Sequence, residues 1–295
     1  MAISGRSGDT RHRSVVINGD LGSGKSTVSV RLGERLGLRR VSVGDLYRQM
    51  AEERGMTALQ LNLHAELDDK VDSYVDQLQS DLAASDEDLI VDSRLAWFFF
   101  KDALKVHLIT EPGVAAVRVL GRPADTVESY RSAAERLASR SESERFRFLS
   151  RYGADKTRLR NYDLVCDSTR ARPEEIVNRI AEQYPGGGSR TALFIDPARI
   201  FPGGAGTPRE GPLLLGYARP HFFVLSGERV LTEALRAGHT LVEASLGAEA
   251  GEPAGGGDGV SERTAEELFA GLSARPGPFA DWEAEHGIRL PVLPA

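Results

Sequence analysis

The feature that most constrains the fold of this 295-residue chain is a glycine-rich segment at residues 19–27, which reads GDLGSGKST. It contains the pattern G-x-x-x-x-G-K-[ST], which forms a phosphate-binding loop between the end of a strand and the start of a helix. The preceding residues 13–18 are typical of a short buried strand, and residues 25–36 have helical periodicity. The segment therefore predicts an α/β fold. The alternative to a phosphate-binding loop is a glycine-rich turn that only joins the strand to the helix.

The residue types in this loop suit the binding of a polyphosphate. Glycines let backbone N–H groups turn toward phosphate oxygens, and the start of the helix adds its positive dipole end. Lys25 can reach the β- and γ-phosphates, and the Ser26 hydroxyl can coordinate Mg²⁺. Only five of the 37 basic residues are lysines, which makes Lys25 conspicuous. We expect ATP to be held by Gly19, Gly22, Ser23, Gly24, Lys25, Ser26 and Thr27.

Strand and helix patterns alternate as far as residue 184. Further strands are expected at residues 40–43, 88–92, 104–110 and 163–166. Helices are expected at residues 45–53, 58–66, 71–83, 113–152 and 173–184. This alternation predicts a parallel sheet with helices on both faces.

Charged side chains follow the strand predicted at residues 88–92. Asp92 can act as a metal ligand beside Ser26, in the role of a Walker-B carboxylate, or can cap a turn as an ordinary strand-end aspartate. Arg94 lies near the crevice where parallel sheets bind ligands, and its guanidinium suits phosphate. Arg48, early in the helix after the second strand, can approach the same crevice. For both arginines a surface ion pair is the alternative.

Arginines are concentrated between residues 118 and 160, where ten arginines and one lysine lie. This density predicts an anion-handling surface or a solvated helix with internal ion pairs, for which Glu135, Glu142 and Glu144 are suitably spaced. The net charge of −6 makes nucleic acid an unlikely partner, since bulk attraction is absent. The charge is uneven, with 28 Lys+Arg against 29 Asp+Glu up to Tyr184 and 9 against 14 beyond it.

The composition changes abruptly after Tyr184, and this predicts two domains. Residues 186–190, GGGSR, are expected to be a flexible linker between a domain at residues 1–185 and a smaller α+β domain at residues 191–295. In the second domain, strands are expected at residues 191–195 and 221–225, a helix at 226–237 and a low-complexity loop at 251–259.

Other features narrow the setting of the chain. The single cysteine, Cys166, excludes an internal disulfide framework and a cysteine-rich zinc site. No stretch approaches about 18 uninterrupted apolar residues, so no membrane span is expected. Residues 1–14 are polar and basic and lack the apolar segment of a secretory signal. A cytoplasmic location is the simplest expectation.

The chain up to Tyr184 resembles the P-loop nucleoside monophosphate kinases, most closely the archaeal-type cytidylate kinases. The resemblance covers about residues 14–184. Besides the loop, it rests on VGDLYR at residues 43–48, DSRLAW at 92–97, RSESERFR at 140–147, YGAD at 152–155 and YDLVCD at 162–167. It implies a core sheet, a region for the acceptor nucleotide and a mobile, arginine-rich lid.

The same resemblance implies an ATP- and Mg²⁺-dependent phosphotransferase acting on a nucleoside monophosphate, with CMP as a candidate acceptor. Asp45, Arg48 and Arg94 would then hold the acceptor. Arg140 and Arg147 would come from the lid onto the transferred phosphate. The chain departs from the family near the acceptor, with Val43 in place of a small or hydroxyl residue, Ser93 in place of glycine, and Leu95 where bacterial members tend to have aspartate. These departures leave the acceptor's identity open.

Residues 191–243 resemble ParB-like nucleotide-binding domains. The resemblance rests on IDPARI at residues 195–200 and HFFVLSGER at 221–229, with Val230 where the family has a second arginine. It implies that Arg229 binds a phosphate at a helix N-terminus. The alternative is a plain strand, turn and helix with Arg229 exposed. The acidic balance of this region disfavours DNA binding and favours a regulatory or second substrate-binding module.

Two functional classes follow from these patterns. The first is a kinase that moves the γ-phosphate of ATP. The second is a nucleotide-sensing regulatory protein that binds ATP or CTP without turnover and contacts a partner whose nature the sequence leaves unknown. Arg94 and the lid arginines favour the kinase, because a sensor needs neither. Both classes require a small-molecule nucleotide as ligand.

Overall fold

The computed structural model describes residues 14–56, 60–61, 70–120, 130–184, 186, 191–203, 207–249, 251, 263–273 and 282–287. Its first five strands are β1 (Ser14–Gly19), β2 (Arg39–Ser42), β3 (Leu89–Asp92), β4 (Ala103–Ile109) and β5 (Leu164–Asp167). They pair in parallel in the order β2-β3-β1-β4-β5. Each lies within two residues of a strand expected from the sequence, and the α/β class is confirmed.

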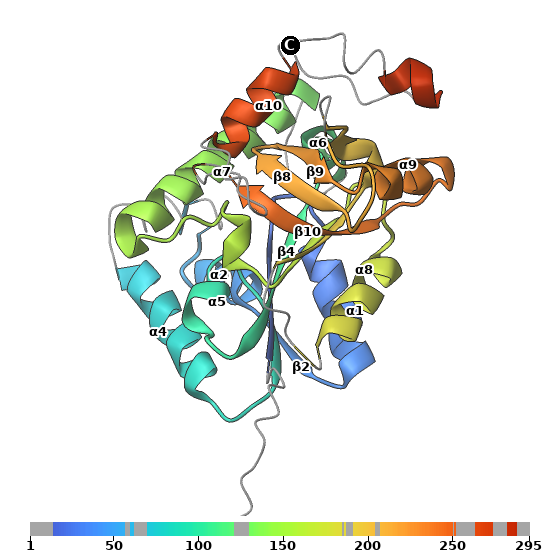
Figure 1. Cartoon of the computed structure of the whole chain (residues 1–295). Coiled ribbons are helices and arrows are strands. Elements are labelled where there is room, and N and C mark those ends of the chain that lie inside the picture. Colours follow the sequence, from blue (N-terminus) through green and yellow to red (C-terminus); the bar gives the residue numbers. More distant parts are fainter. Residues whose placement is uncertain are drawn as a thin grey trace, which may run out of the picture.

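Helices cover both faces of this sheet (Figure 1). One face carries α1 (Lys25–Leu36) and α8 (Pro173–Gln183). The other carries α2 (Val43–Glu53), α4 (Lys70–Ala84), α5 (Ala96–Phe99) and α7 (Tyr130–Tyr152). In β1, Val15 and Ile17 point into the first layer and Val16 into the second, because successive side chains of a strand alternate between faces.

The C-terminal strands extend the same sheet. They are β6 (Ala192–Ile195), β7 (Ile200–Phe201), β8 (Leu214–Ala218), β9 (His221–Ser226) and β10 (Val242–Glu249). Within the described residues the sheet order continues β5-β6-β10-β8-β9-β7, with β6 parallel to β5. The pairs β6–β10 and β8–β9 are antiparallel, so the whole sheet is mixed and mostly parallel. The parallel sheet expected up to residue 184 is present in β1–β5.

The C-terminal region also shares a hydrophobic core with the first part of the chain. One buried cluster joins Val91 and Trp97 to Leu215, Phe222 and Leu231. The C-terminal helices are α9 (Glu228–Arg236) and α10 (Ala265–Ser273), and α10 packs through Phe269 on a separate small cluster. The strands of the expected C-terminal α+β region therefore continue the main sheet, because β6 pairs with β5. The division at residues 186–190 remains a prediction, and apart from Gly186 it lies outside the described residues.

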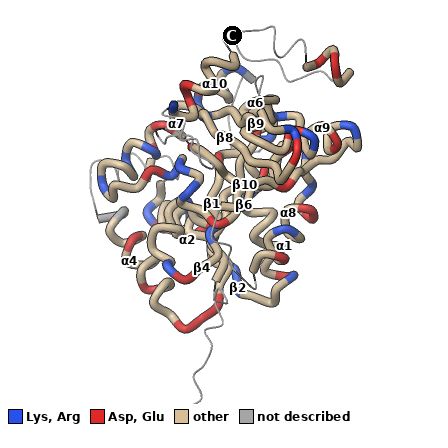
Figure 2. The backbone as a smooth tube through the Cα atoms, in the orientation of Figure 1, with Lys and Arg blue, Asp and Glu red and all other residues tan. Residues whose placement is uncertain are grey.

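Two other expected segments also lie largely outside the described residues, namely the helix at 58–66 and the loop at 251–259. The arginine-rich stretch forms α6 (Pro112–Leu120) and α7, and Figure 2 shows Lys and Arg recurring along α7. No helix in the described part of the chain combines the length and apolar character needed to cross a membrane.

Candidate active site

The glycine-rich loop connects the end of β1 to the start of α1. Gly22 has a φ of 83°, and a Cβ atom there would lie 2.9 Å from the Cα and the carbonyl oxygen of Ala115. Gly24, with a φ of 79°, is the N-cap of α1. Both positions favour glycine, because a side chain is strained at positive φ and Gly22 also lacks space. The loop therefore presents backbone N–H groups at a helix start, as the motif predicts.

Lys25 is the first residue of α1 and lies across its own loop. Its Nζ donates to the carbonyl oxygens of Gly19 at 2.7 Å and Asp20 at 3.0 Å. Burial and the nearby charge of Arg94 lower the pKa of Lys25 to about 8, although Asp92 and Asp20 act in the opposite direction. At neutral pH the ammonium group therefore remains mostly protonated, as phosphate binding requires.

Ser26 and Asp92 meet across 66 residues of sequence. The Ser26 Oγ donates to Asp92 Oδ2 at 3.2 Å, because β1 and β3 are neighbours and both end at this edge. Asp92 Oδ2 also accepts from Arg40 Nη2 at 3.0 Å, and Arg40 Nη1 donates to Asp45 Oδ2 at 3.1 Å. The two predicted metal-binding residues are thus adjacent, and Arg40 joins them to the predicted acceptor residue Asp45.

The Ser26–Asp92 pair fits a magnesium ion by its chemistry. A hydroxyl and a carboxylate supply the hard oxygen ligands that Mg²⁺ prefers. Among the described residues, no group of three or more His, Cys, Asp or Glu side chains is placed to hold a metal. In P-loop sites Mg²⁺ is usually held by one or two protein oxygens together with phosphate and water.

The other predicted acceptor residue, Arg48, lies one helical turn from Asp45 on α2. Arg48 Nη2 pairs with Asp45 Oδ1, and both side chains are exposed. Ser42 caps this helix, since its Oγ accepts from the Asp45 backbone N–H at 3.2 Å. These residues therefore lie just beyond the carboxyl end of β2, at the same edge of the sheet as Asp92.

Three cations converge on Glu144, a buried residue of α7. Its carboxylate accepts from Arg94 Nη1, from Arg140 Nε at 3.3 Å and from Lys156 Nζ at 3.0 Å. Burial opposes its ionisation, but Arg94, Lys156 and Arg140 together hold the pKa of Glu144 down at about 2. The carboxylate is therefore ionised at neutral pH and fixes the positions of these cations.

Arg147, the second predicted lid arginine, lies close to this group. Its charge and that of Arg140 both act on Arg94. Its guanidinium also lies 5.7 Å from the ring centre of Phe148. The structure thus brings all three predicted arginines to one region, while Thr27 is exposed on the first turn of α1.

The sequence analysis missed two cations of the site, Arg40 and Lys156. Arg40 is the second of two successive arginines in β2, and no local pattern distinguishes it from Arg39. Arg40 pairs with Asp92 at the carboxyl end of β3, whereas Arg39 pairs with Glu87, which precedes β3. Lys156 directly follows the YGAD segment and is one of only five lysines, a signal that the sequence offered. Its contact with Glu144 depends on the fold.

A buried polar network lies beneath the loop. Asn18 Nδ2 contacts His107 Nδ1 at 3.1 Å and donates to the Tyr162 hydroxyl, and the His107 and Tyr162 rings stack with centres 4.5 Å apart. The Tyr162 hydroxyl donates in turn to the carbonyl oxygen of Lys156 at 2.8 Å. Burial lowers the pKa of His107 to about 4, with Asp20 opposing that shift and Lys25 and Lys156 adding to it. His107 is therefore neutral at pH 7.

This network predicts a pH dependence of stability. An unfolded histidine has a pKa of about 6.5, so below that value the unfolded state binds a proton that folded His107 does not take up until about pH 4. Stability should therefore fall by up to about 3 kcal/mol as the pH drops through this range. In His107→Gln, urea unfolding at pH 7, 5.5 and 4.5 should show a flatter dependence.

The matched control for this prediction is His239→Gln, which replaces an exposed histidine after α9. It should keep the wild-type dependence of the unfolding free energy on pH. An equal slope in His107→Gln and in the wild type would remove His107 as its source.

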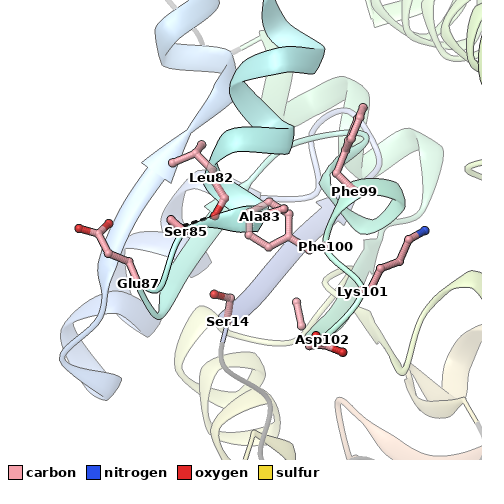
Figure 3. Close-up of a pocket in the computed structure, with 10 residues that line it drawn as sticks. Ser14, Leu82, Ala83, Ser85, Glu87, Phe99, Phe100, Lys101 and Asp102 are labelled. Atoms are coloured by element: carbon pink, nitrogen blue, oxygen red, sulfur yellow. Dashed lines mark hydrogen bonds between the residues drawn. The ribbon is translucent and has the colours of Figure 1, made fainter.

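A separate cavity of about 200 Å³ lies at the opposite end of the sheet (Figure 3). Its lining includes Ser14 and Ala103, the first residues of β1 and β4, whereas the phosphate loop follows the last residue of β1. Two of its charged groups are already engaged, since Glu87 pairs with Arg39 and Lys101 donates to the carbonyl oxygen of Phe98. This cavity is therefore separate from the candidate active site.

The fold and the glycine-rich loop together define a P-loop protein. A glycine-rich loop starts a helix, a serine of that helix meets a strand-end aspartate, and arginines gather at the same sheet edge. This is the arrangement that handles a nucleoside triphosphate in P-loop proteins.

Comparisons with known proteins identify the family. A family model described as AAA domain matches residues 15–147. The cytidylate kinase of Methanobrevibacter smithii is 36% identical over 166 residues, which are 56% of this chain and 95% of that protein. The cytidylate kinase of Natronomonas pharaonis is 37% identical, over 55% of this chain and 84% of its own length. The cytidylate kinase of Sulfurisphaera tokodaii is 34% identical, over 58% of this chain and 93% of its own length.

The chain therefore belongs to the P-loop kinase family that contains these archaeal cytidylate kinases, and the resemblance found in the sequence is confirmed. The matches cover little more than half of the chain. They leave the C-terminal region unassigned and give no support to its ParB-like resemblance, which stays a prediction. Arg229 is exposed and pairs with Glu233 at 2.8 Å and Glu210 at 3.5 Å.

Proposed function

We propose that this chain transfers the γ-phosphate of ATP to a nucleoside monophosphate, with CMP as the first acceptor to test. The observation that carries the proposal is the meeting, at one sheet edge, of the Lys25 loop, the Ser26–Asp92 pair and Arg94 held with Arg140. Family membership supports the same reaction, since the matched relatives are cytidylate kinases.

In this proposal the protein acts by positioning and electrostatics, because phosphoryl transfer requires little covalent chemistry of the enzyme. The loop N–H groups and Lys25 bind the phosphates of ATP. Ser26 and Asp92 would hold Mg²⁺, which when bound neutralises charge on the β- and γ-phosphate oxygens. Arg140 and Arg147 stabilise the charge on the transferred group, and Arg94 binds the phosphate of the acceptor beside it. Glu144 accepts from Arg94 and Arg140 and so keeps these two guanidinium groups close together.

The acceptor is assigned to the side of the site formed by β2 and β3. Arg94 follows β3, and Asp45 and Arg48 follow β2. Two of the departures from the family lie here. Val43 is buried in the core, and Ser93 Oγ donates to Gln79 Oε1 at 2.6 Å while accepting from the Leu95 backbone N–H at 3.2 Å. Ser93 thereby connects the turn that carries Arg94 to α4.

The test is a coupled assay of ADP release from ATP and Mg²⁺ against a panel of nucleoside monophosphates, with CMP, UMP, AMP and GMP as arms. We expect one acceptor, CMP first among them, to stimulate ADP release strongly. A protein that binds ATP or CTP tightly in calorimetry, but whose ADP release no acceptor stimulates, would be a nucleotide sensor, and the kinase proposal would then be rejected.

A further inference from the structure

Two ion pairs connect the C-terminal region to the last residue of β5 and to the loop that follows it. Arg199 belongs to the short 3-10 helix at Pro197–Arg199, and its Nη1 donates to Asp167 Oδ2 at 2.6 Å and to Thr169 Oγ1 at 3.1 Å. In the reverse direction, Arg170 donates to both carboxylate oxygens of Asp196, at 2.7 and 2.6 Å. Asp167 and Asp196 are almost completely buried, so these contacts fix the loop firmly.

The same loop lies against the phosphate-binding loop. Arg118, on α6, donates through Nη2 to the carbonyl oxygens of Ser168 at 2.7 Å and Thr169 at 3.3 Å. Its Nη1 reaches the carbonyl oxygen of Gly22 at 3.4 Å. The Arg118 guanidinium therefore contacts both the loop after β5 and the glycine-rich loop. The ion pairs from the C-terminal region hold the loop after β5 from its other side.

The sheet order shows on which side of the phosphate-binding loop the loop after β5 lies. The acceptor residues follow β2 and β3, on one side of β1, whereas β4 and β5 lie on the other. A nucleoside triphosphate with its phosphates on the glycine-rich loop and its γ-phosphate toward Arg94 must direct its base away from β3. Its base then lies toward the loops after β4 and β5, which Thr169 links by accepting from the Glu111 backbone N–H at 2.9 Å.

We propose that the C-terminal region forms the outer support of the donor nucleotide's base site, with Arg199 and Asp196 as positioning residues for the loop at residues 168–170. This inference rests on the proposed function for the orientation of the donor. According to this proposal, the C-terminal region affects the affinity for ATP and not the affinity for the acceptor. The glycine-rich loop is held by Lys25, and the contact of Arg118 with the Gly22 carbonyl oxygen is long, at 3.4 Å. Loss of the Arg199 contacts should therefore weaken base-dependent affinity more than phosphate affinity.

The test measures binding of Mg²⁺-ATP and Mg²⁺-tripolyphosphate by calorimetry in the full chain. The double variant Asp167→Asn/Arg199→Gln removes both charges, so that no buried carboxylate is left unpaired. Because the loop at residues 168–170 loses its fixed position, we expect the Kd for ATP to rise about ten-fold and the Kd for tripolyphosphate to stay within about two-fold. Arg199→Lys keeps the charge but loses the planar guanidinium that donates to Asp167 and Thr169, so its ATP affinity should lie between those of the wild type and the double variant.

The matched control is Arg236→Gln, which replaces an exposed C-terminal arginine in the last turn of α9 and should leave both Kd values unchanged. Equal weakening of ATP and tripolyphosphate, or no change in either, would overturn the proposal. If the double variant loses the wild-type circular dichroism spectrum, Arg199→Lys is the variant that tests the proposal. An ATP affinity of Arg199→Lys equal to that of the wild type would also overturn the proposal. The assay needs no acceptor, so a wild-type protein that binds ATP without turnover rejects the kinase proposal alone.

Discussion

Lys25→Ala is expected to lower the kcat for phosphoryl transfer by about a thousand-fold, because one preorganised cation at the transferred phosphate contributes on this scale. The fold should persist, since Lys25 is half-buried and, among the described residues, its Nζ bonds to the Gly19 and Asp20 carbonyl oxygens of its own loop. The measurement is ADP release at saturating ATP and acceptor, together with the thermal midpoint.

The control for Lys25→Ala is Lys101→Ala. Lys101 is exposed at the other end of the sheet and donates to the carbonyl oxygen of Phe98. Its replacement should leave kcat unchanged. Turnover near the wild-type value in Lys25→Ala would exclude the glycine-rich loop from the reaction.

Arg94→Ala is expected to raise the KM for the acceptor by about 10- to 100-fold, the loss of a charge-assisted pair with phosphate, and to change the KM for ATP far less. Glu144 keeps Arg140 and Lys156 as partners in this variant, so no buried carboxylate is left without a cation. The KM for the acceptor in Arg94→Lys should lie between those of the wild type and Arg94→Ala, because an ammonium keeps the charge but loses the bidentate geometry.

Arg39→Ala is the matched control for Arg94→Ala, since Arg39 is exposed and pairs with Glu87 away from the site. Initial rates measured over a grid of ATP and acceptor concentrations give both KM values for each variant. Equal increases in the two KM values would remove Arg94 from the acceptor side of the site.

Local patterns predicted the elements that form the site. The helix expected at residues 25–36 is α1 with the same bounds, because a glycine in the left-handed region begins it and another, Gly37, ends it. The strands before the glycine-rich loop and before Asp92 were also predicted, since their apolar runs are short and bounded by turn residues.

The C-terminal topology was harder to predict. β10 has the sequence VEASLGAE, in which alanine, glycine and glutamate are weak strand formers, so no strand was expected there. It forms because its neighbours β6 and β8 supply hydrogen bonds and alternate residues of β10 are buried. The same pairing joins the C-terminal region to the main sheet, a connection that a change in composition after Tyr184 does not reveal.

By itself, the sequence determined the glycine-rich loop, the strands and helices around it and the residues able to bind phosphate, because these depend on backbone preferences within a few residues. Only the tertiary structure decided which charges meet. Arg40 reaches Asp92 across 52 residues and Arg94 reaches Glu144 across 50. Arg199 reaches Asp167 because β6 pairs with β5. Such contacts follow from strand order and helix placement, which no local pattern encodes.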